Sequence, residues 1–394
     1  MTLPPEEKMK KKRDPTTVIR LRWSLFLWSF ADTFPKNIFF LFDAESVHDF
    51  IIKFGKLLGS NPISKFKTKL LFNYENEILE QSVLGINFKN PVGLAAGFDK
   101  NGYLIDILPN VGFGFVEIGS ITGEKCEGNE KPRLWRLKKS RALVVNYGLT
   151  NEGSERISER LKNKKCNIPL GISIAKTNSK ECADTIKGIK DYVKATKKFS
   201  NIGDYFTINI SCPNAFGGQP FHEKSKLDFL LNEIDKIETK KPIFLKISGD
   251  LSFKEIDDII SVSNKHKVNG FILINLTKKR DNKKILDKDI PEKGGISGKV
   301  EEDLSNKIIE YVYKKTKGRY VIIGVGGIFS AEDAYIKIKL GASLVQLITG
   351  MVYEGPQLIS EINYGLVKLL KKDGFKNISE AVGVDSKIIS KSSK

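Results

Sequence analysis

Eight short apolar segments, separated by longer amphipathic stretches rich in lysine, constrain the fold of this chain more than any other feature of its sequence. The segments span residues 92–96, 115–118, 170–174, 205–210, 243–247, 271–274, 320–325 and 344–348. Apolar runs of this length are typical of parallel strands that are buried on both faces of a sheet. Eight such strands alternating with helices predict an α/β fold, a (β/α)8 TIM barrel.

The segment before the barrel predicts a small N-terminal helical domain. Val47, Phe50, Ile51, Phe54 and Leu57 recur at helical spacing. The aromatic residues around them allow two interpretations, a helix pair packed on its own domain or an apolar tunnel or membrane-facing patch. We expect a disordered basic N-terminus at 1–17, a helical cap at 18–75, the barrel at 76–385 and a C-terminal tail at 386–394.

Charge and cysteine content narrow the function. The net charge is +18, but the lysines are spread along the chain without a recognition helix or a basic-aromatic stripe, so we expect no nucleic-acid partner. The four cysteines form no CxxC pair, which predicts neither a disulfide framework nor a metal site. No apolar run reaches the ~20 residues that span a bilayer. The basic segment 8–13 fits part of a targeting sequence, whereas Glu6 and Glu7 are unusual in one.

Polar and glycine residues follow several of the predicted strands, at the barrel end where active sites form. GVGGI (324–328), QLITG (346–350) and GGISG (294–298) are glycine-containing loops. Such loops let backbone N–H groups hold a phosphate, with Ser297 and Gly298 as further donors. The alternative is that these glycines only form turns. Three loops in one part of the barrel favour a phosphate-bearing ligand.

Two lysines and a thiol stand at other strand ends. Lys246 lies inside an apolar strand, and Lys100 follows another, which is costly without an anionic partner. Each lysine therefore binds a ligand or pairs with a barrel carboxylate such as Asp99 or Glu117. In NISCPN (209–214), Cys212 between two asparagines is either an inert buried residue or a general base whose pKa nearby lysines lower.

Seven motifs in order resemble the dihydroorotate dehydrogenase family. They are NPVGLAAGFDKNG (90–102), GFGFVEIGSIT (112–122), GNEKPRLWRL (128–137), NISCPN (209–214), GGISGK (294–299), IIGVGGI (322–328) and GASLVQL (341–347). The resemblance covers residues 41–382. The KPRLWRL segment and FDAESVHDF (42–50) are similar to class 2, the membrane-associated enzymes that use quinone.

The resemblance implies oxidation of dihydroorotate to orotate in pyrimidine biosynthesis, with FMN lying across the barrel mouth. The implied FMN ligands are Ala95, Ala96, Gly97, Ser120, Thr177, Asn209 and Lys246 near the ring, and Ser297, Gly298, Gly326, Gly327 and Thr349 near the phosphate. The implied substrate ligands are Lys100, Asn146, Asn209, Asn214 and Asn275, with Cys212 as the catalytic base. Quinone would bind under the cap, which would attach the protein peripherally to a membrane. That membrane would be the mitochondrial inner membrane in a eukaryote, or the inner membrane on its cytoplasmic face in a bacterium.

Four positions depart from the family pattern. Cys212 stands where class 2 has serine and resembles the soluble class 1. Thr177 replaces a flavin-contacting asparagine, and Leu276 removes a hydroxyl beside the substrate. Val145 stands where a substrate-binding asparagine belongs, so that Asn146 substitutes only if the loop shifts. These departures leave two alternatives, a soluble electron acceptor such as fumarate and a flavin-binding protein without turnover.

Overall fold

The computed structural model describes residues 38–215, 217–218 and 220–386. The chain divides into two units between Leu41 and Phe42, and all elements named below belong to the second unit. The expected disordered N-terminus, the first part of the expected cap and nearly all of the expected C-terminal tail lie outside the described residues.

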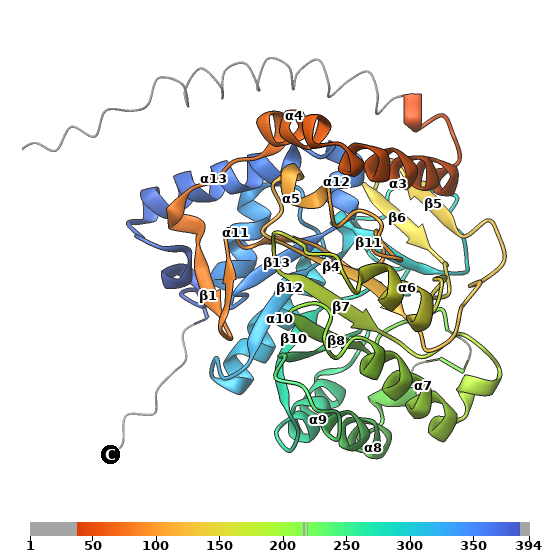
Figure 1. Cartoon of the computed structure of the whole chain (residues 1–394). Coiled ribbons are helices and arrows are strands. Elements are labelled where there is room, and N and C mark those ends of the chain that lie inside the picture. Colours follow the sequence, from red (N-terminus) through yellow and green to blue (C-terminus); the bar gives the residue numbers. More distant parts are fainter. Residues whose placement is uncertain (1–37, 216, 219, 387–394) are drawn as a thin grey trace, which may run out of the picture. The chain divides into compact units, whose positions relative to one another are not determined.

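Eight parallel strands close into a barrel in the order β10-β12-β13-β3-β4-β7-β8-β9 (Figure 1). These strands are β3 (Val92–Leu94), β4 (Phe115–Ile121), β7 (Leu170–Ile174), β8 (Tyr205–Asn209), β9 (Ile243–Ile247), β10 (Val268–Leu273), β12 (Val321–Val325) and β13 (Leu344–Leu347). Each overlaps one predicted apolar segment, so the predicted barrel is confirmed. The start of β10 differs because Asn269 interrupts the apolar run, and its side chain accepts a hydrogen bond from the Ile243 N–H on β9 at 2.9 Å.

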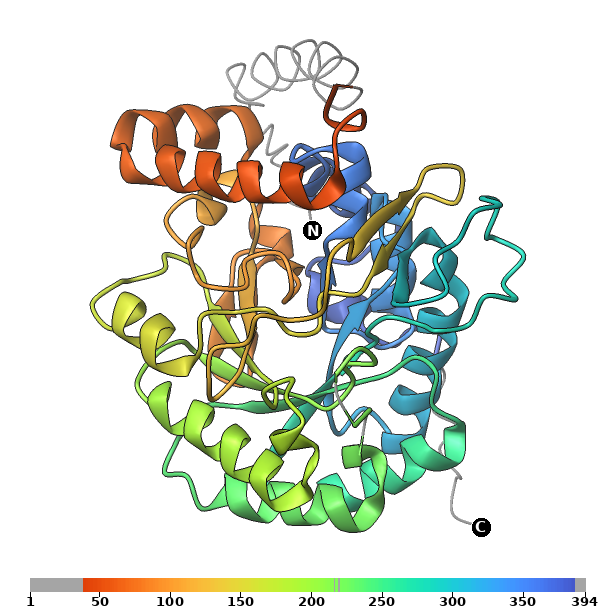
Figure 2. The same ribbon diagram turned by 90° about the vertical axis from the view of Figure 1, so that its right-hand side faces the viewer.

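Helices follow the strands and pack around the outside of the barrel (Figure 2). The α-helices are α5 (Leu108–Val111), α6 (Ser154–Leu161), α7 (Thr185–Lys198), α8 (Lys224–Asp235), α9 (Phe253–Ser263), α10 (Glu302–Thr316), α11 (Ala331–Lys339), α12 (Thr349–Glu354) and α13 (Leu358–Asp373). Short 3-10 turns are η1 (Glu77–Leu79), η2 (Glu181–Ala183), η3 (Pro220–His222), η4 (Lys299–Glu301) and η5 (Ile378–Ala381). Their buried faces are apolar, as the amphipathic pattern predicts.

The barrel interior is filled at the end where the strands begin. Phe115, Tyr205, Phe244 and Leu344 lie near the starts of their strands and form one buried cluster with Phe88. Phe88 belongs to a hairpin of β1 (Gln81–Val83) and β2 (Ile86–Phe88), and its ring meets the Phe115 ring edge-on, with centroids 5.3 Å apart. This packing leaves the opposite end, where the strands finish, for a ligand.

A second sheet stands beside the barrel mouth. It is antiparallel, in the order β11-β6-β5, with β5 (Leu134–Leu137), β6 (Ala142–Val145) and β11 (Gly295–Gly298). The β6–β11 pairing brings the GGISG loop next to residues 142–145, although the two segments are far apart in the sequence. The sheet thus places a predicted phosphate-binding loop at the mouth.

Two helices precede the barrel, α3 (Ala44–Ser60) and α4 (Pro62–Phe72). The α3 helix confirms the predicted helical spacing, and the Asp43 side chain caps it by accepting a hydrogen bond from the Ser46 N–H at 2.8 Å. Gly59 lets α3 approach the barrel closely, because a Cβ there would stand 3.2 Å from the Asp106 Cβ. Among the described residues, no helix combines the length and apolarity needed to cross a bilayer.

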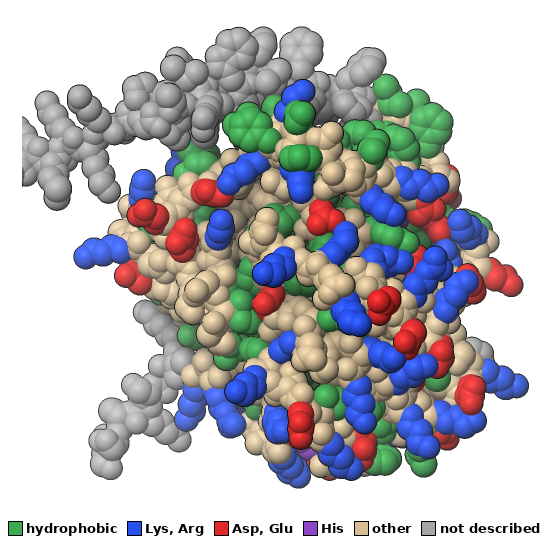
Figure 3. All heavy atoms as spheres, in the orientation of Figure 1, with side chains coloured by type: hydrophobic (Ala, Val, Ile, Leu, Met, Phe, Trp, Pro, Cys, Tyr) green, Lys and Arg blue, Asp and Glu red, His purple; other side chains and the backbone are tan. Residues whose placement is uncertain are grey.

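The outer side of α3 and α4 exposes a group of apolar side chains to solvent among the described residues. Figure 3 shows such side chains gathered over these two helices. The most exposed are Phe50, Phe54, Leu57, Ile63, Phe66 and Leu70. Together we call them the cap face. Apolar side chains grouped in this way mark an interaction surface more often than scattered ones do.

Candidate active site

A continuous chain of amides and hydroxyls crosses the barrel mouth. Ser120 on β4 hydrogen-bonds Ser173 on β7, with 2.8 Å between their hydroxyl oxygens. The Asn209 Nδ2 at the end of β8 donates to the Ser120 hydroxyl at 2.8 Å. Its Oδ1 accepts from the Ser211 hydroxyl at 2.7 Å, and the Asn275 Nδ2 donates to that same hydroxyl at 2.9 Å. The structure thereby brings together three predicted site residues, Ser120, Asn209 and Asn275.

Lys246 lies buried beside this chain without a counter-ion. Its side chain is 4% exposed, and among the described residues it makes neither a hydrogen bond nor an ion pair. Burial lowers its pKa, which the nearby carboxyls of Glu117 and Glu301 oppose. The Glu117 Oε2 accepts hydrogen bonds from the side chains of Thr207, Tyr205 and Gln346 inside the barrel. An anionic or electron-rich ligand would therefore supply the counter-charge that Lys246 lacks.

Three glycine loops and two hydroxyls converge on another part of the mouth. The Ser297 and Thr349 hydroxyls hydrogen-bond each other at 2.8 Å. Gly298 has φ +111, and a Cβ there would stand 2.5 Å from the Arg141 carbonyl oxygen. A Cβ on Gly327 would stand 2.5 Å from the Glu302 Cβ, and Gly326 has φ +108. Only glycine fits these positions, and glycine loops of this kind suit an anion.

The predicted ring-contacting residues follow the first barrel strand directly. Ala95 is buried, Ala96 is partly buried and Gly97 is exposed. Gly97 has φ +112, and its N–H donates to the Gly119 carbonyl at 2.7 Å. Small side chains at this position would let a flat ligand approach the backbone above the ends of β3 and β4.

Cys212 follows the amide-hydroxyl chain, immediately after Ser211. Burial raises the pKa of its thiol above the ordinary value. The Asn214 N–H and the charges of Lys176 and Lys278 act in the opposite direction but do not outweigh burial. The expectation that neighbouring lysines lower this pKa is therefore correct for the sign of their effect and wrong for the net result.

Lys100 lies between the barrel and the start of α3. Its ammonium stands 3.9 Å from the centre of the Tyr147 ring, a cation–π contact. Burial lowers the Lys100 pKa to about 8, while Asp49 and Glu45 of α3 oppose that shift. Neither Asp99 nor Glu117 forms an ion pair with Lys100 or Lys246 among the described residues. The Asp99 carboxylate instead accepts from the Tyr103 and Leu104 N–H groups, at 2.9 and 2.7 Å.

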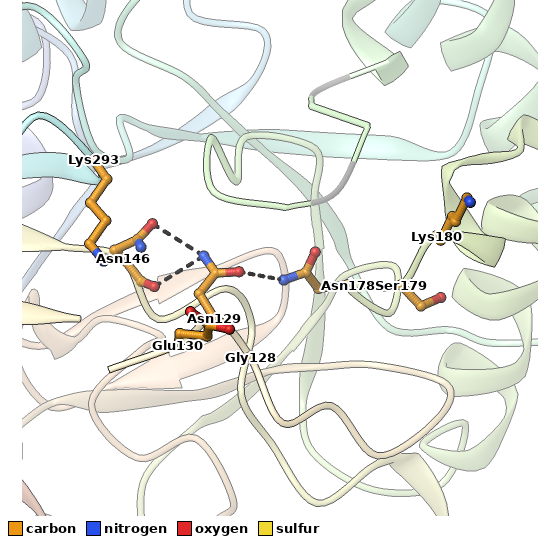
Figure 4. A pocket seen from close by; sticks show the side chains of 8 residues that line it. All are labelled: Gly128, Asn129, Glu130, Asn146, Asn178, Ser179, Lys180 and Lys293. Atoms are coloured by element: carbon orange, nitrogen blue, oxygen red, sulfur yellow. Dashed lines mark hydrogen bonds between the residues drawn. The ribbon is translucent and has the colours of Figure 1, made fainter. Parts of the chain in front are cut away.

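Asn146 and Asn214 are connected through Asn129. The Asn129 Nδ2 donates to the Asn146 Oδ1 and to the Asn214 carbonyl, each at 3.1 Å. The Asn129 Oδ1 also accepts a hydrogen bond from the Asn178 Nδ2 at 3.0 Å. The side chains of Asn129, Asn146 and Asn178 line a polar cavity of about 440 Å³ (Figure 4). Val145 lies on β6, where its carbonyl accepts from the Asn214 Nδ2 at 2.8 Å. The Asn146 side chain thus faces this cavity.

The remaining departures have clear local partners. The Thr177 hydroxyl donates to Asp191 on α7 at 2.8 Å, and the Thr177 N–H donates to the same carboxylate at 2.7 Å. The Leu276 side chain packs against Gly295, where an added Cβ would stand 2.6 Å from the Leu276 Cβ. Both residues are therefore committed to packing or to hydrogen bonds within the protein.

Sequence reasoning missed Ser173, Ser211, Asn129 and Glu301. Ser211 adjoins Cys212 in the NISCPN motif, so its position at a strand end was a usable signal. Asn129 and Glu301 come from irregular segments whose approach to the mouth depends on the second sheet. Asn129 stands in the GNEKPRLWRL motif, which indicated no role for it, and no local pattern marks Glu301.

The sequence matches the dihydroorotate dehydrogenase family over residues 78–370. The dihydroorotate dehydrogenase (quinone) of Trichodesmium erythraeum is 40% identical over 332 residues, covering 80% of this chain and 86% of that protein. The corresponding protein of Natronomonas pharaonis is 38% identical over 350 residues, covering 89% and 98%. The crystal structure of DHODH in complex with ferulenol from Eimeria tenella matches with a TM-score of 0.78 and 29% identity, covering 87% of this chain and 96% of that one. The chain therefore belongs to the dihydroorotate dehydrogenase family.

Proposed function

We propose that this protein binds FMN across the barrel mouth, oxidises dihydroorotate to orotate for pyrimidine biosynthesis and passes the electrons to a quinone. Family membership supports this reaction. The observation that carries the proposal is the buried Lys246, unpaired among the described residues, beside an amide-hydroxyl chain at the barrel mouth that also carries the glycine loops.

The residues at the mouth fit a flavin nucleotide. Gly298, Gly326 and Gly327 would hold its phosphate with the Ser297 and Thr349 hydroxyls. Lys246 would stand beside the ring, near Ala96 and Ser120. Bound FMN would supply a ring that accepts a hydride from carbon and releases electrons to a second substrate. Thr177 would contribute through its neighbours, because its own hydroxyl already binds Asp191.

Cys212 would act as the general base. The Sγ of its thiolate would take the proton from C5 of dihydroorotate as C6 gives up a hydride. Burial makes the thiolate scarce but more basic once it forms, and Lys176 favours it by charge. At neutral pH a smaller fraction of the enzyme would therefore carry the thiolate, but each thiolate would be a stronger base.

The substrate would be held by charge and by amides. The Lys100 ammonium would meet its carboxylate, while Asn209, Asn214 and Asn275 would bind its ring amide and carbonyl edges. Asn146 would act indirectly, because it faces the polar cavity and reaches Asn214 through Asn129. The amide-hydroxyl chain orients Asn209 and Asn275 before substrate arrives, which reduces the cost of ordering them.

The N-terminal helices, which we assign to a cap domain at 18–75, would provide the quinone route and the membrane contact. The buried Tyr147 hydroxyl lies beneath α3 without a hydrogen-bond partner among the described residues, which suits a quinone carbonyl. The exposed cap face would rest in the lipid interface. The protein would then be peripheral, on the mitochondrial inner membrane of a eukaryote or the cytoplasmic face of a bacterial inner membrane.

Anaerobic reduction tests the proposal. Dihydroorotate should bleach the yellow protein, and a quinone should restore its colour. Cys212→Ala should keep the bound flavin but lose turnover, because the base is removed and the cradle is not. Near-normal turnover in that variant would disprove the assigned base. Reoxidation by fumarate in place of quinone would support the soluble-acceptor alternative, and failure to bleach would support a protein without turnover.

A further inference from the structure

Glu301 is a buried acid at the barrel mouth that the proposed reaction does not use. It closes the 3-10 turn η4, three residues after Gly298 of the GGISG loop. Its side chain is 3% exposed, and its Oε1 is buried with no hydrogen-bond partner among the described residues. A buried carboxyl oxygen without a partner is costly, so it points to a polar group that the protein itself does not provide.

The position of Glu301 narrows the identity of that group. Its Cβ lies 3.4 Å from where a Cβ on Gly326 would stand, so the side chain leaves the backbone against the GVGGI loop. Its carboxyl also lies near enough to Lys246 for the two groups to interact electrostatically. Glu301 therefore lies against a loop assigned to the phosphate and within electrostatic reach of the lysine assigned to the flavin ring.

The charge state of Glu301 favours a neutral partner. Burial raises its pKa well above the ordinary range, and Asp250 raises it further. The Gly298 N–H and the charges of Lys337 and Lys246 oppose this shift without reversing it. Burial therefore favours the protonated carboxyl, which offers one donor and one acceptor, the pattern that a hydroxyl group complements.

We propose that Glu301 binds the ribityl hydroxyls of FMN, the uncharged polyol that joins the phosphate to the ring. This inference rests on the proposed FMN site. Of the three parts of that cofactor, the phosphate is anionic and suits the glycine cradle, and the ring lies by Lys246. The polyol is the part whose hydroxyls match the unpartnered carboxyl oxygen that Glu301 holds beside the GVGGI loop.

Flavin binding to the apoprotein tests this role without recourse to turnover. FMN is titrated against wild type, Glu301→Gln and Glu301→Leu, and dissociation constants are measured from the quenching of flavin fluorescence. Loss of one buried hydrogen bond should weaken FMN binding about tenfold in Glu301→Leu. Glu301→Gln keeps a donor and an acceptor and should stay within about threefold of wild type.

An FMN analogue with an unhydroxylated phosphopentyl chain supplies the second arm. Wild type and Glu301→Leu should bind this analogue equally, because it lacks the groups that Glu301 would contact. Glu310→Leu, on the same α10 side of the barrel but in an exposed pair with Lys314, is the matched control and should bind FMN normally.

Two results would overturn the assignment to the polyol. One is normal FMN binding by Glu301→Leu, and the other is an equal loss with FMN and the analogue, which indicates a general defect of the site. If the leucine variant does not fold, Glu301→Met serves in its place, with thermal unfolding of each apoprotein as the check. Wild-type apoprotein that binds neither flavin would instead reject the proposed function, and this inference with it.

Discussion

Arg133 and Glu45 form a two-pronged ion pair that fastens α3 to the sheet beside the barrel mouth. The Arg133 Nε lies 3.0 and 3.1 Å from the two Glu45 carboxylate oxygens, and its Nη2 lies 2.8 Å from Oε1. Both side chains are largely buried, and Arg133 also donates to the Asn129 carbonyl at 3.0 Å. Because Asn129 contacts Asn146 and Asn214, the pair connects the cap to the residues around the substrate site.

Breaking this pair should destabilise the protein. Glu45→Gln leaves the Arg133 cation buried without a counter-charge, and we expect a loss of about 2–3 kcal/mol in the free energy of unfolding. Urea unfolding measures it. Glu310→Gln removes an exposed partner of Lys314 and should cost under about 0.5 kcal/mol. Equal losses in the two variants would show that the buried Arg133–Glu45 pair stabilises the fold no more than an exposed pair does.

The pH profile should report the Cys212 thiol. A base works only when deprotonated, and burial raises this pKa above its ordinary value of 9.0. The rate of flavin reduction by dihydroorotate should therefore still be rising at pH 9. Lys176→Met removes a charge that favours the thiolate, so the rising limb should move to higher pH.

Stopped-flow reduction across a pH series checks this shift. Lys187→Met is the control, since Lys187 lies exposed on α7 and pairs with Glu181. Its profile should coincide with that of wild type. A limb that stays in place in Lys176→Met would contradict the electrostatic role of Lys176.

Lys337 should make stability depend on pH. Its ammonium is fully buried and donates to the Ser305 hydroxyl at 2.9 Å, and that hydroxyl donates to the Val325 carbonyl just before Gly326. Burial lowers the Lys337 pKa from 10.5 to about 7. Between these values the unfolded chain binds a proton that the folded chain does not, so stability rises with pH.

Comparing wild type with Lys337→Met isolates this effect. The stability of wild type relative to the variant should increase from pH 7 to pH 10, by at most about 1.4 kcal/mol per pH unit. Urea unfolding at several pH values gives the slope. Lys241→Met is a matched control away from the mouth, because burial lowers the Lys241 pKa only to about 8. Its slope should begin about one pH unit higher, and a flat difference for Lys337→Met would refute the prediction.

The sequence was sufficient for the barrel because each strand is a mostly apolar run. Where a polar residue enters a strand, as Asn269 does in β10, the predicted start shifts. The α4 helix was not predicted as a separate element, although Asn61 and Pro62 form a good helix start. These errors are local, and they leave the topology unchanged.

The site was harder to predict, because half of it depends on contacts between distant segments. Strand ends pointed to Asn209, Lys246 and Asn275, which the barrel geometry gathers. The pairing of β11 with β6 carries η4 and Glu301 to the mouth, and no periodic pattern in the sequence encodes that pairing. The net rise of the Cys212 pKa also depends on burial, which only the packed fold reveals.

The cap face should determine membrane binding. Phe66 and Leu70 lie on α4 and are 62% and 48% exposed. Replacing both by aspartate puts charge where we expect lipid, while little packing is lost. Sedimentation with phosphatidylcholine–phosphatidylglycerol vesicles should show a drop in bound protein of at least about tenfold, since each charge opposes insertion.

Leu286→Asp alters an exposed apolar residue outside the cap face and should leave vesicle binding unchanged. Flavin reduction by dihydroorotate should be equal in all three proteins, because it needs only the barrel. Undiminished vesicle binding by the double variant would show that the cap face is not the membrane contact.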